Sequence, residues 1–482
     1  MKKLLRTLGI LVFLIISYII FKTLSFDSKQ KSYTPTKLEA IPKQSLVNLS
    51  EAVKIQTISN DNLIIDTTKF IAFHQYLEQN YPTAHQLLEK KNTNSLSLMY
   101  RWKGKQEKLD AIVLLAHMDV VPIENEALWK KAPFSGLIDN EYIWGRGTLD
   151  DKGAIIAIFE SIEMLAASGF VPERDIYLCF GHDEETLGSG AKGMAEILKE
   201  EGVKAHLILD EGLLITVNMI PGIKDKAVAL IGTAEKGYIS VDLNISTQGG
   251  HSSTPPKENA IQELNKALYL IFENPMPSYL SEPVEDFIVT IGPEMDYPNK
   301  LAFANYKIFE SIIIDTYEGS VNGAALVNNT IAPTIITSGI KENVLPSQAK
   351  ATINFRLLPG TTSDMMLAHL RKTINNPNIS LTSRSNTHEA SKVSPIDHEA
   401  FMAIDQSIKE VFGNDVISCP NLSIAATDAR FYEDISEQIY RFLPVVATDE
   451  IVESIHGNNE KISIENFEQS IRFYHQLIKN TQ

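Results

Sequence analysis

The chain has 482 residues, enough for two or three domains, and its 44% hydrophobic and 22% charged residues are typical of a globular protein. Sixty acidic against 44 basic residues give a net charge of −16, which argues against a nucleic-acid partner because no basic excess can neutralise phosphates. Nothing in the spacing of the only two cysteines, Cys179 and Cys419, argues for a disulfide.

The N-terminus carries three basic residues within its first six positions and continues into an uncharged apolar run, residues 8–21. Extended through Lys22, the run reaches roughly 20 residues, the length that spans a bilayer. No Ala-x-Ala cleavage site follows, so we expect residues 1–26 to be an uncleaved signal anchor, with a cleaved signal peptide as the alternative. The basic start predicts an exported body, periplasmic, extracellular or lumenal, that is secreted if the segment is cleaved.

The next segments alternate between helices and strands. Residues 27–45 are polar and predict a tether. Beyond it, apolar residues recur with the 3.6-residue period of helices, and short apolar runs indicate buried strands. This alternation predicts an α/β fold with a mostly parallel central sheet covered by helices on both faces. The expected helices lie within 46–89 and at 151–168 and 191–200, and the expected strands lie at 95–100, 109–116, 175–181 and 205–209.

The pattern changes near Gly232 and predicts an inserted module. Its order of strand, helix, strand, strand, helix, strand is that of a compact, ferredoxin-like α+β unit. We expect residues 46–232 and 391–482 to form the larger domain in two parts, and residues 233–390 to form a lid. Residues 276–329 give no clear pattern. The expected elements of the lid are strands at 238–245, 330–340 and 348–357 and helices at 259–272 and 363–374.

Three carboxylates in a row, Asp183, Glu184 and Glu185, follow the apolar strand 175–181. Adjacent carboxylates repel one another and are costly to remove from water. A chain keeps such a triplet at a strand end when a positive group lies beside it. A divalent metal would serve, with one carboxylate as ligand and its neighbour as base.

Further histidines and carboxylates lie at other strand ends and glycine turns, where open α/β sheets bind ligands. Each has a structural alternative when taken alone: Asp150 as a helix cap, Asp210 as a turn residue, His456 as a surface histidine. Their joint occurrence favours a metal site. These residues are His117, Asp119, Asp150, Asp210 and His456.

Imidazole and carboxylate ligands without thiolate suit zinc, with cobalt or manganese as substitutes. Two imidazoles and three carboxylates exceed what one catalytic zinc takes, but they fit two zinc ions that share a bridging carboxylate. Such two-metal sites hydrolyse amides and esters.

The motifs resemble, in order, those of the dinuclear zinc peptidase family of aminoacylase and glutamate carboxypeptidase, and most closely its branch of carboxypeptidase S and the N-fatty-acyl-amino-acid hydrolase/synthase. The resemblance covers roughly residues 45 to 478. The motifs are HMDVVP at 117–122, GRGTLDDKG at 145–153, GHDEETLG at 181–188, LDEG at 209–212, GGHSSTPP at 249–256 and IHGNNEKI at 455–462.

The resemblance implies a zinc-peptidase-like catalytic domain with two zinc ions per subunit. Asp150 would bridge the ions, His117 and Asp210 would complete one site, and Glu185 and His456 the other. Glu184 matches the general base, and Asp119 matches the carboxylate that orients the histidine. In the lid, His251 matches a histidine that stabilises the oxyanion, and Arg356 and Asn343 match residues that hold the substrate carboxylate.

The implied reaction is cleavage of an amide bond to an amino acid with a free carboxylate. The substrate is a small peptide, as for a carboxypeptidase, or an N-acyl amino acid, as for an aminoacylase. A non-enzymatic scaffold is the third reading, against which the complete set of matches argues. The family also implies a homodimer through the lid.

One departure from the family pattern concerns Ala425 and Ala426, where relatives often carry glycine before the loop 427–430. The specificity for the acyl side of the substrate therefore stays open.

Overall fold

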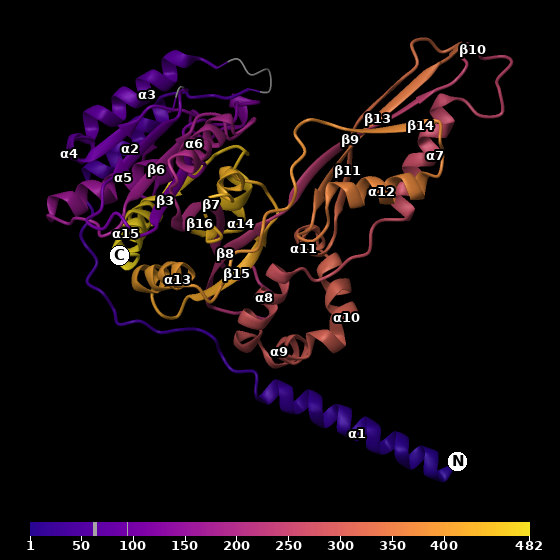
Figure 1. Cartoon of the computed structure of the whole chain (residues 1–482), viewed down its shortest axis with the longest axis horizontal. Coiled ribbons are helices and arrows are strands. Elements are labelled where there is room, and N and C mark those ends of the chain that lie inside the picture. The colour runs from indigo at the N-terminus through magenta and orange to yellow at the C-terminus, as the bar shows by residue number, and fades with distance from the viewer. Residues whose placement is uncertain (61–64, 94) are drawn as a thin grey trace.

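The computed structural model describes residues 1–60, 65–93 and 95–482. Figure 1 shows an α/β body, a lid that extends to one side of it, and a long N-terminal helix that projects from the base. Most of the segments predicted from the sequence are present. Residues 61–64, which fall within the region 46–89 predicted to be helical, lie outside the described residues.

The N-terminal helix α1 (Lys2–Leu24) contains an 18-residue stretch with a mean hydropathy of 2.4, and that stretch is 0% buried. Its length and composition are those of a membrane span and fit a signal anchor and a signal peptide alike. The polar segment that follows lies extended along the body. The Gln30 amide donates to the Ser418 carbonyl and accepts from its N–H, both at 2.9 Å, and the Tyr33 hydroxyl donates to Asp405 at 3.0 Å.

The body contains a sheet of mixed but mainly parallel order, β1-β2-β6-β3-β7-β16-β8-β15. Strand β3 runs parallel to β6 and β7, β16 parallel to β7, and β15 parallel to β8. The predicted α/β class is therefore confirmed. The bounds are β1 Leu88–Lys91, β2 Leu98–Trp102, β3 Ala111–His117, β6 Ile176–Gly181, β7 Ala205–Val217, β8 Ala227–Glu235, β15 Ile417–Ser423 and β16 Ile439–Ala447.

Helices cover both faces of this sheet, because alternate strand residues point to opposite sides. On β3, Ile112 and Leu114 join one apolar cluster, and Val113 and Leu115 join another on the opposite face. The first cluster lies under α2 (Gln44–Lys54), α3 (Thr67–Asn80), α4 (Pro82–Leu87), α5 (Lys152–Ala167), α13 (Glu399–Phe412) and α15 (Ile464–Asn480). The second lies under α6 (Ser189–Glu200).

Strand β7 is longer than the predicted 205–209, so the Asp-Glu-Gly motif lies inside it rather than after its end. The pairing of β7 with β16 shifts register at Arg441. Gly212 has a φ of 147°, and a Cβ there would lie 2.6 Å from the Arg441 Cβ. Glycine therefore lets the two strands approach closely while the ladder continues past the bulge.

The lid is an antiparallel sheet in the order β11-β13-β9-β14, as a ferredoxin-like unit requires, with α7 and α12 packed on its apolar face. A short ribbon of β10 and β12 lies at the end farthest from the body (Figure 1). The bounds are β9 Gly237–Ser246, β10 Gly250–His251, α7 Ala260–Glu273, β11 Thr330–Ser338, β12 Val344–Leu345, β13 Gln348–Leu357, α12 Ser363–Ile374 and β14 Ile379–Ser383.

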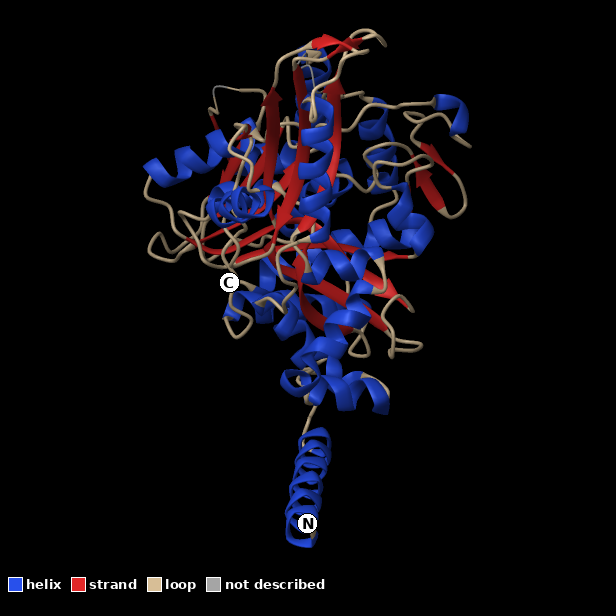
Figure 2. Ribbon diagram, turned by 90° about the vertical axis from the view of Figure 1, so that its right-hand side faces the viewer, coloured by secondary structure: helices blue, strands red, loops and turns tan. Residues whose placement is uncertain are grey.

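Residues 276–329, for which the sequence gave no pattern, fold mainly into α8 (Glu282–Ile291), α9 (Tyr297–Ala304), α10 (Tyr306–Glu318) and α11 (Val321–Val327). These helices lie within the range predicted for the lid, but they pack on the edge of the body sheet. Phe287 and Ile288 of α8 share an apolar cluster with Ile417 and Leu422 of β15. Figure 1 shows α8 and α9 near the body end of α1, and Figure 2 shows α1 projecting from below a group of helices.

Candidate active site

Chain segments from both parts of the body converge at the carboxyl end of β3. His117 is the last residue of β3, and Asp150 lies in the turn before α5. Glu185 follows β6, and Glu211 lies on β7. His456 follows the short helix α14 (Asp449–Ser454) and has a φ of +58°, a left-handed conformation that side chains rarely adopt and that is concentrated at functional sites.

Asp150 lies between the two histidines. Its Oδ1 is 2.8 Å from His117 Nε2, and its Oδ2 is 2.9 Å from His456 Nε2. Glu185 Oε2 is 3.1 Å from His456 Nε2, and Glu211 Oε1 is 3.3 Å from His117 Nε2. Each histidine therefore shares Asp150 and has one further carboxylate of its own.

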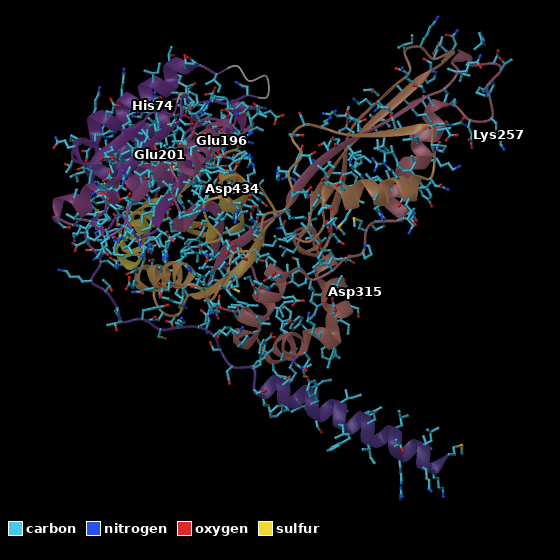
Figure 3. All side chains as sticks on the ribbon, in the orientation of Figure 1. His74, Glu196, Glu201, Lys257, Asp315 and Asp434 are labelled. Atoms are coloured by element: carbon cyan, nitrogen blue, oxygen red, sulfur yellow. The ribbon has the colours of Figure 1, made fainter. Side chains whose placement is uncertain are left out.

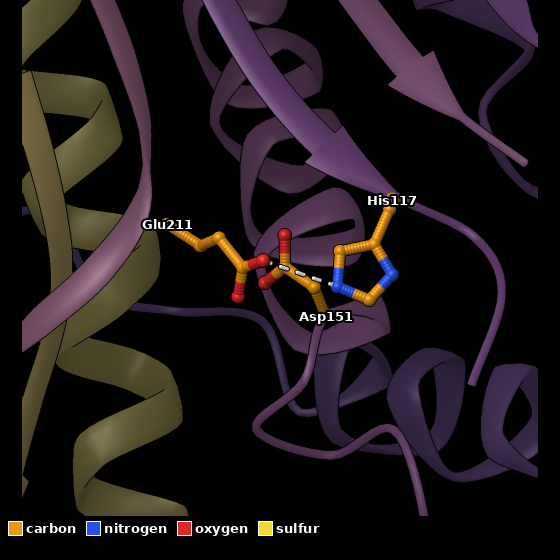
Figure 4. A group of neighbouring side chains, drawn as sticks. All are labelled: His117, Asp151 and Glu211. Carbon is orange, nitrogen blue, oxygen red and sulfur yellow. Dashed lines mark ion pairs between the residues drawn. The ribbon is translucent and has the colours of Figure 1, made fainter. Parts of the chain in front are cut away.

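Glu211, and not its neighbour Asp210, points toward His117. Figure 4 shows the carboxylates of Glu211 and Asp151 next to each other, both on the side of the His117 ring, with a dashed line for the Glu211–His117 pair. Asp210 accepts hydrogen bonds from the N–H groups of Glu211 and Ala429 at 3.0 and 2.7 Å. Successive side chains of a strand point to opposite faces, so only one of these two carboxylates can face the histidine.

The donor atoms of this cluster fit divalent cations. Ligand atoms of His117, Asp150 and Glu185 lie within 4.8 Å of one another, and those of His117, Asp151 and Glu211 form a second such group. Among the described residues, the buried Glu185 Oε1 and both Asp151 carboxylate oxygens have no hydrogen-bond partner. Buried carboxylates without partners are costly, and a bound cation would satisfy them.

The pKa shifts of the histidines and carboxylates in the cluster also favour a bound cation. Burial and the Asp150 charge raise the pKa of Glu211 to about 7. Burial alone would lower the pKa of His117, but Glu211 and the hydrogen-bonded carboxylates hold it well above its usual range. Hydrogen bonds with Asp150 and Glu185 raise the pKa of His456 to about 10. By itself the cluster therefore retains protons, which divalent cations would displace.

Asp119 orients the first histidine and the loop of the triplet together. It is fully buried, its Oδ1 lies 3.3 Å from His117 Nδ1, and its backbone carbonyl lies 3.0 Å from the same nitrogen. The two carboxylate oxygens accept hydrogen bonds from the N–H groups of Glu184 and Glu185 at 3.1 and 3.2 Å. This is the supporting role expected of a carboxylate behind a metal-binding imidazole.

Glu184 lies mostly buried beside the cluster, with the nearest guanidinium, that of Arg430, 4.0 Å away. Burial raises the pKa of Glu184 well above its usual range, and the nearby Asp428 raises it further. A carboxyl group with a raised pKa can both take and return a proton near neutral pH.

A model of the peptidase family M20/M25/M40 matches residues 113–480. The chain belongs to this family. It is 37% identical to a probable carboxypeptidase S-like 2 of Dictyostelium discoideum, over 98% of this chain and 92% of the relative. It is 33% identical to the N-fatty-acyl-amino acid synthase/hydrolase PM20D1 of Homo sapiens, over 98% and 97%. These relatives bear out the expected branch, and the chain is a metal-dependent amide hydrolase.

Solved structures show the same fold. The M20 family metallo-carboxypeptidase Sso-CP2 from Sulfolobus solfataricus superposes with a TM-score of 0.67 at 19% identity, covering 91% of this chain and 99% of that one. Human carnosine dipeptidase 1 superposes with a TM-score of 0.57 at 15% identity, covering 91% and 96%.

Two further residues of this M20 peptidase, Arg146 and Glu460, hold the loops of the cluster together. The buried carboxylate of Glu460 accepts hydrogen bonds from the N–H groups of Gly147 and Leu149, both at 2.9 Å, just before Asp150. Arg146 pairs with Glu460 and donates to the Gly457 carbonyl at 2.7 Å. The loops that carry Asp150 and His456 are thus tied to each other. The IHGNNEKI motif contained this signal, but only its histidine was assigned a role.

Asp183, the first residue of the triplet, has a structural role. Its carboxylate accepts hydrogen bonds from the N–H groups of Ser189 and Gly190 at 2.9 and 2.8 Å. It thereby satisfies N–H groups at the start of α6, as a capping residue does. The triplet therefore combines one structural carboxylate with two that face the cluster.

The lid residues named from the sequence separate into two groups. Arg356, near the end of β13, stacks on Tyr238 at 4.8 Å, and burial and the nearby Arg430 lower its pKa. His251 and Asn343 lie together on the exposed ribbon at the lid tip, where the Ser252 N–H donates to the Asn343 carbonyl at 3.2 Å. Figure 1 places this ribbon away from the strand ends that carry the metal-binding cluster.

The loop that departs from the usual glycine pattern is accommodated without glycine. Neither Ala425 nor Ala426 adopts a positive φ. Thr427 then accepts the Ala429 N–H at 3.4 Å at the start of the turn that leads to Arg430. The alanines therefore place no strain on this loop.

Proposed function

We propose that this M20 peptidase is a two-zinc carboxypeptidase that releases a C-terminal amino acid with a free carboxylate. Asp150 would bridge the ions, with His117 and Glu211 at one and His456 and Glu185 at the other. Glu211 replaces Asp210 in this ligand set because its side chain faces His117 at 3.3 Å. Such ions, when bound, activate water and polarise the scissile carbonyl.

The protein groups perform the proton transfers. Glu184 takes a proton from the attacking water and delivers it to the leaving nitrogen, for which its raised pKa is suited. Asp119 keeps His117 in one orientation and accepts the Glu184 backbone N–H at 3.1 Å. The base and the histidine are thereby held at a fixed distance and orientation to each other.

The position of the Arg430 guanidinium beside the base is the observation that carries the proposed substrate class. Arg430 lies 4.0 Å from Glu184, and Arg356 of the lid stacks on Tyr238 at 4.8 Å, where burial and then Arg430 lower its pKa. Two like charges at this place favour an anion between them, and a guanidinium binds a carboxylate bidentately. The free carboxylate of the leaving amino acid would supply that anion.

A matched pair of substrates tests this proposal. We expect turnover of short peptides with a free C-terminus and a loss of at least 100-fold in kcat/KM when the same C-terminus is amidated, since the two guanidiniums then lose their charged partner. Equal turnover of the two forms would contradict carboxylate recognition.

An N-acyl-amino-acid hydrolase is the second candidate, because the similar Homo sapiens protein is named as an N-fatty-acyl-amino acid enzyme. The chemistry and the carboxylate contact would be the same, and only the acyl side would differ. Dipeptides assayed against N-acyl derivatives of the same amino acids decide between the two by their kcat/KM.

We also propose that two chains associate through the lid. His251 is exposed at the lid tip, and β11 is a free edge strand with Ile335 and Ile336 exposed by 45% and 61%. Unpaired edge strands with apolar residues pair with other chains. If the lid supplies His251 to the site of its partner, mixing Glu184→Gln with His251→Ala protein should restore activity that neither shows alone. No recovery in a proven mixed dimer would contradict it.

The N-terminal helix completes the proposal. We infer that α1 anchors the enzyme in a membrane with the body on the outer side, as the basic residues before the apolar run indicate. Protease added outside sealed vesicles should digest the body and spare α1. Protection of the body would reverse the topology.

A further inference from the structure

We propose that the outer face of α9, α10 and α11 lies in the interfacial layer of the membrane that α1 spans. The lipid surface would then fix the orientation of the enzyme body relative to the membrane. This inference rests on the proposed anchoring by α1. The occupant of the face is the boundary between lipid headgroups and acyl chains.

The base of α1 is attached to these helices and does not hang free. Thr23 is 1% exposed, and the Asn305 side-chain amide donates to Thr23 Oγ1 at 3.2 Å and to the Ile19 carbonyl at 3.3 Å. Phe26 packs so closely on Gly292 that a Cβ there would lie 2.6 Å from its ring. Figures 1 and 2 both show helices of the body gathered at the root of α1. Helix α9 therefore lies beside the end of α1 at which the chain would leave the membrane.

The segment after α1 limits how far the body can swing. The Gln30 side-chain amide makes two hydrogen bonds of 2.9 Å with the backbone of Ser418. The Gln30 side-chain oxygen also accepts a hydrogen bond from Lys409 at 3.0 Å. The Tyr33 backbone N–H donates to the Asn414 side chain at 2.9 Å, and the Asn414 amide donates back to the Tyr33 carbonyl at 2.9 Å. A polar segment held in this way acts as a strap rather than as a flexible linker.

The outer face of the three helices carries large apolar side chains. Tyr297 is 56% exposed, Ile308 50%, Ile312 58% and Val321 88%. Ile308 and Ile312 lie on either side of a kink at Phe309 in α10, and both are exposed. The neighbouring residue Ile313 is buried in the cluster with α8 and β15. Helix α10 therefore carries buried apolar residues that join a cluster and exposed ones that, among the described residues, belong to none.

The polar residues around this face suit an interfacial depth and not full insertion. Lys307, whose ammonium pairs with Glu285, and Asp315 lie near the isoleucines in the sequence, and Figure 3 shows Asp315 at the outer side of α10. Lysine reaches headgroups while its stem covers apolar surface, and tyrosine is favoured where an apolar ring meets a wet boundary. Shallow burial of the isoleucine and valine side chains removes apolar surface from water and adds to the membrane attachment that α1 provides.

The test places a fluorophore at single cysteines of the full-length enzyme reconstituted in phosphatidylcholine vesicles. The positions are Ile312→Cys on the proposed face, Ile15→Cys in α1 and Leu128→Cys, which is 59% exposed on the body. The native Cys179 and Cys419 are buried and leave the labels selective. Lipids with a quencher on the acyl chain should quench labels at Ile15 and Ile312 several-fold more than the label at Leu128.

Each other outcome contradicts a defined part of the account. Quenching at Ile15 with none at Ile312 would overturn this inference and leave the anchor intact. No quenching at Ile15 would overturn both. Self-quenching at Ile312 in detergent without quencher lipid would show that a second copy covers the face, and would also overturn the inference.

Discussion

The body and the lid use their functional residues in opposite ways. In the body, side chains from distant segments meet in one mostly buried cluster, with contacts of 2.8 to 3.3 Å to the two histidines. In the lid, His251 and Asn343 are exposed and Arg356 lies at the end nearest the body. The cluster proposed to bind metal is therefore pre-assembled, whereas the lid residues proposed to bind substrate would need lid closure or a partner chain to reach it.

The difference follows from how each part is held. The cluster is fixed by buried supports: Asp119 behind His117, and Glu460 behind the turn before Asp150. The lid tip has a two-stranded ribbon whose residues are largely exposed. Changes in the body should therefore alter chemistry or metal content, and changes in the lid should alter substrate binding or lid stability.

The largest expected effect is at the base. Glu184→Gln should lower kcat by roughly 100- to 10,000-fold, because the proton can no longer be taken from water, while metal content stays unchanged. The exposed Glu196→Gln on α6 is the matched control. Unchanged turnover in Glu184→Gln protein would remove the base from the account.

The next effect separates two adjacent carboxylates of the body. Glu211→Gln should weaken metal binding by at least 10-fold and lose about one ion per chain, since a charged ligand is replaced by a neutral one. Asp210→Asn should keep both ions, because that side chain accepts backbone N–H groups instead. Metal analysis after dialysis measures the ions retained by each variant. Loss of an ion from Asp210→Asn but not from Glu211→Gln would identify Asp210 as the ligand.

A change in the lid should leave the metals in place. Arg356→Lys keeps the positive charge but loses the bidentate geometry, so we expect KM to rise by about 10-fold with a smaller change in kcat. Kinetics on one peptide substrate and metal analysis on the same sample test both halves. A loss of bound metal would show that lid and body are not separable in this way.

The smallest effect concerns lid stability and pH. Burial alone would raise the pKa of Asp242, but hydrogen bonds with Lys350 and Arg384, among others, lower it to about 2. A lowered carboxylate pKa stabilises the folded lid above the unfolded value near 4 and ceases to do so as pH falls through 2. Asp242→Asn should therefore cost about 1 kcal/mol at neutral pH, and the difference in Tm should shrink below pH 4. A constant difference down to pH 2 would contradict this.

The sequence predicted four strands of the body sheet and the helices between them, because apolar periodicity records burial directly, but it assigned no strand to β8, β15 or β16. It predicted His117, Asp150, Glu185 and His456 as one cluster, and the structure brings them together. Which of Asp210 and Glu211 faces His117 could not be predicted, since that depends on the phase of a bulged strand. Residues 276–329 gave no pattern because several of their helices have apolar residues on more than one side.

Anomalous diffraction at the zinc edge from crystals of the zinc-loaded, full-length enzyme tests the central claim most directly. The account predicts two peaks on either side of Asp150, one beside His117 and Glu211 and the other beside His456 and Glu185. A single peak, or a peak coordinated by Asp210 with Glu211 turned away, would contradict it.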